Sequence, residues 1–185
     1  FKGDFTGFYY DFVAYGRFYT GLGNLSSDLL LKRDAITNTI KYAGALSSHS
    51  FDVGKMLGVA DYVGRAEFDL NIRGDGLGKG TAKAHLDGLI AGIDINNYYY
   101  RNIELKGDLA NRRFKGSLEV KEENLDFVFN GEIDNSRSPA LFNFYSSVNE
   151  AKLAKLNFVT TIPNPIFSIN MASNFSGDDI DNMEG

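Results

Sequence analysis

Residues 103–133 read IELKGDLANRRFKGSLEVKEENLDFVFNGEI. Apolar side chains recur at every second position of this stretch, and charged or polar side chains occupy the positions between them. Such a period of two predicts β-strands that have one apolar face and one face in contact with water. We therefore expect three strands here, joined by two short turns.

The spacing also predicts how these strands pair. A two-residue turn at Asn111-Arg112 would place Gly107 opposite Gly116, because asparagine tolerates the positive φ that such turns need. A second turn at Glu123-Asn124 would place Gly116 opposite Gly131, so that every apolar residue meets an apolar partner. Glycine normally weakens a strand, so this row of three predicts a crease in the sheet. Ordinary bulge glycines are the alternative interpretation.

The same signature recurs along the chain. The pattern apolar, any, glycine, any, apolar occurs at Ala14–Phe18, Tyr42–Leu46, Leu86–Ile90, Leu105–Leu109, Phe114–Leu118 and Phe129–Ile133. The content of 20 glycines, 15 phenylalanines and 10 tyrosines against three prolines is typical of many strands joined by short turns. We predict an all-β fold: an antiparallel, strongly curved or folded-over sheet with an open groove, as one unit over residues 1–185.

Two segments depart from the strand pattern. Residues 50–58 and 150–156 have helix-like spacing, and the first begins at a possible Ser50 cap and ends at Gly58. We expect each to form a single helical turn that plugs or caps the sheet.

The apolar face is the candidate site. We predict that its side chains line a groove for lipid acyl chains, because so large an apolar face requires a cover of protein or lipid. The predicted lining residues are Ile103, Leu105, Leu109, Phe114, Leu118, Val120, Leu125, Phe127, Phe129 and Ile133.

Composition disfavours several other functions. The net charge is −5 and the basic residues are scattered, which disfavours nucleic acid as a partner. The chain has no cysteine, hence no disulfide, thiolate metal site or cysteine nucleophile. It also lacks a run of about 20 apolar residues and a signal-peptide pattern. The alternation is already under way at Phe5, so we expect an internal fragment of a longer protein.

The chain has few candidates for catalysis or for cofactor binding. His49, in a Ser-Ser-His-Ser stretch that reads as a loop, and His85, in an alternating strand, lack a paired acidic motif. The glycine-rich segment 74–81 lacks the Ser or Thr of a phosphate loop and continues into a strand, which indicates a flexible turn. The acidic segment 178–182 lacks the spacing of a calcium loop. We expect no enzymatic activity, no cofactor and no metal.

One family has similar motifs in the same order. The stretch Tyr98–Gly107 is followed by Phe114-x-Gly116-x-Leu118, Asn124-Leu125 and Phe129-x-Gly131-x-Ile133, and the chain thereby resembles the TamB (translocation and assembly module) and AsmA-like proteins. Tyr42–Leu46 with Phe51–Gly54, and Phe142–Phe144 with Leu153–Phe158, extend the resemblance over roughly residues 40 to 158. One departure is Glu122-Glu123, where relatives often carry Asp-Pro.

The resemblance implies a periplasmic protein of Gram-negative bacteria, anchored in the inner membrane and reaching toward the outer membrane. Its folded-over "β-taco" sheet would carry phospholipid or help outer-membrane proteins to assemble, with an outer-membrane β-barrel as a possible partner of other parts of the protein.

Other functions stay open at the level of the sequence. The apolar face could instead close into a β-sandwich core of a binding module, for example for carbohydrate. The open sheet edges could pair with strands of client outer-membrane proteins, which would make the chain a scaffold or chaperone. A hydrolase ranks last, because no nucleophile, base and orienting group can be named together.

Overall fold

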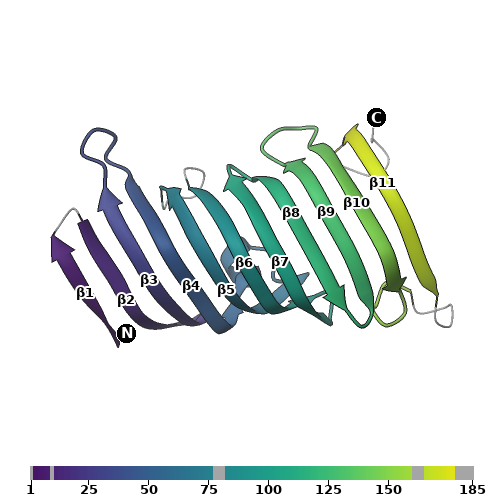
Figure 1. Ribbon diagram of the computed structural model, residues 1–185, viewed down its shortest axis with the longest axis horizontal. Helices are drawn as coiled ribbons and strands as arrows, with labels where there is room; N and C mark the ends of the chain where they lie inside the picture. The colour runs from purple at the N-terminus through teal and green to yellow at the C-terminus, as the bar shows by residue number, and fades with distance from the viewer. Residues whose placement is uncertain (1, 9–10, 77–81, 160–164, 178–185) are drawn as a thin grey trace.

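A single antiparallel sheet of eleven strands makes up nearly all of the protein (Figure 1). The computed structural model describes residues 2–8, 11–76, 82–159 and 165–177. Each strand pairs with its neighbours in chain order, so β1 and β11 are the two edges of an open, curved meander. The predicted all-β, antiparallel architecture is confirmed.

The elements follow one another with short connections. They are β1 (Lys2–Phe8), β2 (Asp11–Thr20), β3 (Gly23–Arg33), β4 (Ile40–Asp52), α1 (Val53–Leu57), β5 (Val63–Asp75), β6 (Lys83–Ile95), β7 (Tyr98–Ala110), β8 (Arg113–Glu122), β9 (Leu125–Asp134), β10 (Leu141–Lys152) and β11 (Ile166–Ser176).

The register predicted for β7, β8 and β9 is confirmed. Gly107 pairs with Gly116, and Gly116 pairs with Gly131. Asn111 and Arg112 have φ values of 50° and 63°, as a tight hairpin turn requires. Pairing continues past the three glycines without a register shift, so the alternative interpretation as bulge glycines is wrong for this row.

Close packing explains why these positions are glycine. A Cβ atom added to Gly116 would meet the Lys106 carbonyl oxygen and would lie 2.5 Å from the Gly107 Cα atom. A Cβ atom on Gly107 would lie 2.7 Å from the Phe114 ring, which covers that glycine. Gly131 has a φ of 155°, which side chains rarely adopt. The row therefore marks a line along which neighbouring strands and rings approach too closely for any side chain.

Irregular pairing occurs in two groups of strands, β3–β6 and β9–β11, near their lower ends in Figure 1. Register shifts occur at Asn24/Ser26, Ser48/Phe51, Val63/Ala66, Glu67/Phe68 and Val148/Glu150. Each extra residue disrupts the ladder, bends its strand and increases the local twist. The strands curve most visibly at these ends.

The helix α1 confirms one of the two expected helical turns, with a correction to its start. Asp52, and not Ser50, caps it: the Asp52 Oδ1 atom accepts a hydrogen bond of 3.0 Å from the Lys55 backbone N–H. Gly58 ends the helix in the left-handed conformation, as expected.

The second expected helical turn is wrong over residues 150–152. These residues are the end of β10, where pairing with β9 satisfies their backbone groups. A turn over residues 153–157 follows, with one bond of helical spacing from the Leu156 N–H to the Lys152 carbonyl.

The glycine row leads to a test of packing. We expect Gly116→Ala to lower the free energy of unfolding by about 1–3 kcal/mol, because the new methyl group overlaps the backbone of β7. Gly21→Ala is the matched control, since a Cβ atom there meets nothing within 4 Å, and we expect a change within about 0.5 kcal/mol. Urea denaturation measures both. Equal effects of the two substitutions would contradict the close approach.

Candidate functional site: the apolar face of the sheet

One face of the sheet is apolar from β2 to β11. Because alternate residues of a strand share a face, the pairing assigns each position to one side. One row across the apolar face runs through Leu46, Leu70, Gly88, Leu105, Leu118, Phe129 and Ser146. The row beside it on the opposite face runs through Ser47, Asp69, Leu89, Glu104, Glu119, Val128 and Ser147.

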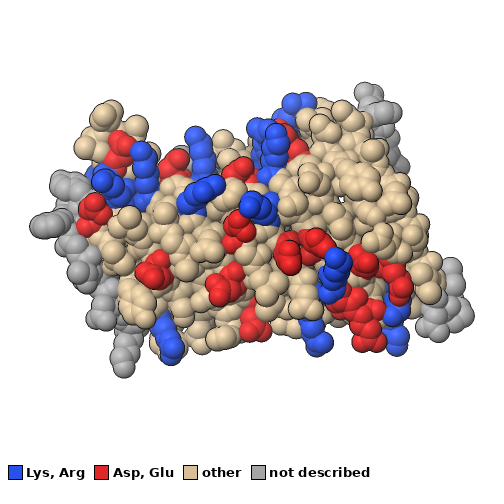
Figure 2. Space-filling model, in the orientation of Figure 1, with Lys and Arg blue, Asp and Glu red and all other residues tan. Residues whose placement is uncertain are grey.

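The opposite face is polar. Figure 2 shows lysine, arginine, aspartate and glutamate side chains spread over this face, with α1 behind the strands in the same orientation in Figure 1. Ion pairs cross it between neighbouring strands, such as Lys106–Asp87 at 3.0 Å and Arg113–Glu132 at 2.6 Å. The sheet therefore presents water with one face and a hydrophobic surface with the other.

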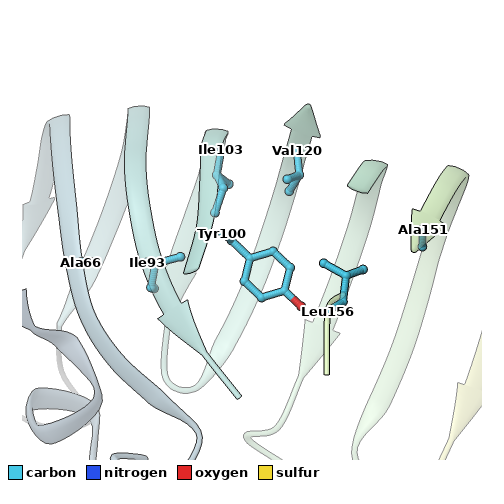
Figure 3. Close-up of a cluster of buried hydrophobic side chains, with 7 residues drawn as sticks. All are labelled: Ala66, Ile93, Tyr100, Ile103, Val120, Ala151 and Leu156. Carbon is cyan, nitrogen blue, oxygen red and sulfur yellow. The ribbon is translucent and has the colours of Figure 1, made fainter. Parts of the chain in front are cut away.

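A buried cluster closes the lower half of the apolar face. Figure 3 shows its members: Ala66, Ile93, Tyr100, Ile103, Val120, Ala151 and Leu156. Val53 of α1 and Leu153 of the turn after β10 pack against this cluster. Leu156 is only 1% exposed, which makes it the most deeply buried large side chain of the described residues. Two short segments outside the sheet thus cover the apolar face where the ends of β5–β10 meet, which we call the covered half.

The predicted lining residues divide between this cluster and the other half of the face. Ile103 and Val120 belong to the cluster, and Leu118, Leu125 and Phe127 pack against it. The other five, Leu105, Leu109, Phe114, Phe129 and Ile133, are not among its members. Leu109 is 40% exposed, and Leu105, Phe114 and Ile133 are partly exposed. The upper half of the face is therefore open.

A row of aromatic rings extends the open half toward β11. Phe129 is 8% exposed because it lies between Phe114 and Phe144, at centroid distances of 6.3 and 5.3 Å. Phe142 and Phe175 stack at 4.7 Å beyond them. Phe142, Phe144 and Phe175 were not in the predicted lining set. The alternation of Phe142-Asn143-Phe144 could have identified two of them.

Polar groups on the apolar face bond within the protein. The Ser27 hydroxyl donates to the Ala14 carbonyl at 2.8 Å, and the Tyr42 hydroxyl donates to the Lys83 carbonyl at 3.1 Å. Burial raises the pKa of Tyr42 and of Tyr100 above the usual value, so these phenols stay neutral. This surface favours ligands that require neither a charge nor a hydrogen bond.

The total surface area agrees with a single layer. The chain exposes 12082 Å², against roughly 8,900 Å² expected for a compact monomer of this mass. A second layer of structure over the whole face would remove much of this difference.

The two histidines lie away from the apolar face. His49 is in strand β4, which corrects the expected loop, and its Nδ1 atom lies 3.1 Å from Glu67 Oε1. The His85 Nδ1 atom lies 2.8 Å from Asp108 Oδ1. The described part of the chain contains no group of three or more His, Cys, Asp or Glu residues arranged to hold a metal ion.

Two sequence interpretations fall outside the described residues. These are the glycine-rich turn, of which residues 77–81 are not described, and the acidic segment 178–182. Among the described helices, none has the length and apolar character needed to span a membrane.

The fold and the site together define a class: a single-layer, open antiparallel β-sheet that carries a partly covered hydrophobic face. Comparison with protein-family models, curated proteins and solved structures found no match.

The cover of the lower half can be tested at its centre. We expect Leu156→Ala to destabilise the fold by about 2–5 kcal/mol, because it leaves a cavity over Tyr100, Ile103 and Val120. Phe158→Ala removes a side chain of the same segment that is 61% exposed, and we expect a change below about 1 kcal/mol. Thermal unfolding of both variants measures the difference. A small effect at Leu156 would mean that the turn does not seal the face.

Proposed function

We propose that the open half of the apolar face shelters lipid acyl chains, and that the chain is a segment of a lipid-bridging protein of the TamB and AsmA-like kind. In such a protein this sheet would form part of a hydrophobic path through the periplasm between the inner and outer membranes. The partners are then phospholipid acyl chains, with an inner-membrane anchor elsewhere in the protein and outer-membrane biogenesis as the process served.

The observation that carries this proposal is the uncovered upper half of the face. Leu109, Phe114 and Ile133 are exposed or partly exposed on a surface whose polar groups bond internally. A protein surface of this kind requires an apolar cover. Acyl chains meet that requirement without hydrogen bonds, and their flexibility lets them follow a surface of phenyl rings and aliphatic side chains.

The energetics favour acyl chains of ordinary length. Each methylene removed from water contributes about 0.8 kcal/mol to the free energy of binding. The contributions add along the chain, so an acyl chain that is sheltered along half of its length would bind appreciably. The glycines of this face carry no charge, and the Phe114 ring that covers Gly107 adds a further apolar surface, so an acyl chain would meet no charged group there.

A second candidate function rests on the edge strand β11. Phe167, Ile169 and Met171 share the apolar face and are exposed. An unpaired edge with apolar side chains can accept another strand, as a scaffold for outer-membrane protein assembly would require. The closed-sandwich alternative has less support, because a single open layer has no second sheet to pack against.

The lipid proposal is testable with two leucines of equal exposure. Leu109 is 40% exposed on the apolar face, and Leu89 is 41% exposed on the polar face. With a photocrosslinking residue at either position, we expect lipid adducts at 109 and only background labelling at 89. Mass spectrometry after illumination of cells identifies the adducts. Protein adducts alone at position 109 would favour the scaffold function instead.

The same leucine distinguishes an open groove from a sealed core. We expect Leu109→Glu to lower the free energy of unfolding by only about 1 kcal/mol, because the carboxylate stays hydrated in an open groove. In a sealed core the same change would cost several kcal/mol. Chemical denaturation measures the change, with Leu89→Glu as the control for added charge.

A further inference from the structure

We infer that the upper rim of the groove binds a phosphodiester anion between the Arg112 and Arg137 guanidinium groups. The inference rests on the proposed function, because it names the headgroup chemistry that accompanies the acyl chains. The hollow lies where the β7–β8 turn meets the segment 135–140 that connects β9 to β10. Its volume is about 360 Å³, and it is lined by Arg112, Asn135, Ser136, Arg137, Ser138 and Ala140.

Backbone hydrogen bonds hold the two sides of this hollow together. The Asn135 N–H donates to the Arg112 carbonyl at 3.1 Å, which ties the connection to the neighbouring turn. The Gly177 N–H donates to the Ala140 carbonyl at 3.0 Å at the other end of the connection. Ala140 is buried at the end of the segment, whereas residues 135–139 are exposed to solvent. The backbone of the hollow is therefore held at both ends by hydrogen bonds.

The two guanidinium groups are available for a ligand. Neither Arg112 nor Arg137 forms an ion pair or a side-chain hydrogen bond within the described residues, whereas the adjacent Arg113 pairs with Glu132 at 2.6 Å. Guanidinium groups bind phosphate oxygens with paired, charge-assisted hydrogen bonds. The side-chain amide of Asn135 lies in the same lining and is a further donor.

The balance of charge favours a phosphodiester over a phosphate dianion. Asp134 adjoins the hollow and accepts hydrogen bonds from the Ser136 N–H and hydroxyl at 2.9 and 2.5 Å. These bonds, and then the charges of Arg113 and Arg137, hold the pKa of Asp134 below its usual value, so that it stays ionised. Two guanidinium groups and one carboxylate leave one net positive charge, which the single negative charge of a phosphodiester neutralises.

The position at the rim suits a phospholipid. Arg112 lies two residues before Phe114, and Arg137 lies four residues after Ile133, so the hollow borders the open half of the apolar face. From Phe114 to Leu118, where the covered half begins, β8 rises by about 13 Å. The acyl layer of one bilayer leaflet is about 15 Å deep. A lipid held at the rim by its phosphate would thus extend its chains along the open half.

The test compares two double variants with the same loss of charge. Arg112→Gln/Arg137→Gln alters the hollow, and Arg17→Gln/Lys115→Gln removes two cations elsewhere on the protein. Native mass spectrometry measures loading with phosphatidylglycerol and with a diacylglycerol of the same chains. We expect the first variant to load about tenfold less phosphatidylglycerol with diacylglycerol unchanged, and the control to match the unmodified chain. Unchanged phosphatidylglycerol loading in the first variant would overturn the inference.

A second measurement separates a lipid headgroup from a soluble anion. Glycerophosphoglycerol and inorganic phosphate are titrated separately while the amide resonances of Asn135, Ser136 and Ser138 are followed by NMR. We expect saturable shifts with the diester and weaker shifts with inorganic phosphate, both lost in Arg112→Gln/Arg137→Gln. Absence of shifts together with unchanged lipid loading would refute the phosphodiester site but would leave the lipid groove supported. Diester shifts without loading of either lipid refute the groove and leave a site for soluble phosphodiesters.

Discussion

The structure depends on one constraint: a sheet of a single layer has two faces, and its own strands can cover neither. Alternation along each strand places charged side chains on one face and apolar side chains on the other, so water solvates only the first. The second must be covered by other parts of the chain or by a ligand. The division of that face into a covered half and an open half follows from how little chain lies outside the strands.

Two features set the local geometry of the layer while its strands stay paired. The glycines Gly107, Gly116 and Gly131 bring neighbouring backbones close together, and the Phe114 ring fills the space above the first of them. The bulges near the opposite ends of the strands add twist where α1 and the 153–157 turn cover the face. The covered half supplies the buried core that stabilises the protein. The open half is held by the continuation of the same paired strands and by the packing of Phe129 between Phe114 and Phe144.

Charge is placed where it leaves the apolar face undisturbed. Ion pairs such as Lys106–Asp87 lie on the polar face, where exposed pairs contribute little stability but keep the sheet hydrated. Arg112 and Arg137 lie at the end of the strands, where the two faces meet. This separation matches the chemistry of an amphipathic ligand, whose charged group needs water and donors and whose chains need neither. The proposed lipid function and the proposed phosphodiester site are consistent on this basis.

The sequence by itself determined the three strands of residues 103–133, the parity of their faces, the turns at Asn111-Arg112 and Glu123-Asn124, and the glycine register. These features depend on local geometry, since a shift by one residue would expose every apolar side chain of a strand. Only the tertiary structure decided that residues 150–152 continue β10, and that Leu156 covers Ile103 and Val120. It also brought Arg112 beside the 135–140 connection. These contacts join segments far apart in the chain, where burial and pairing outweigh the local preferences that a sequence pattern reports.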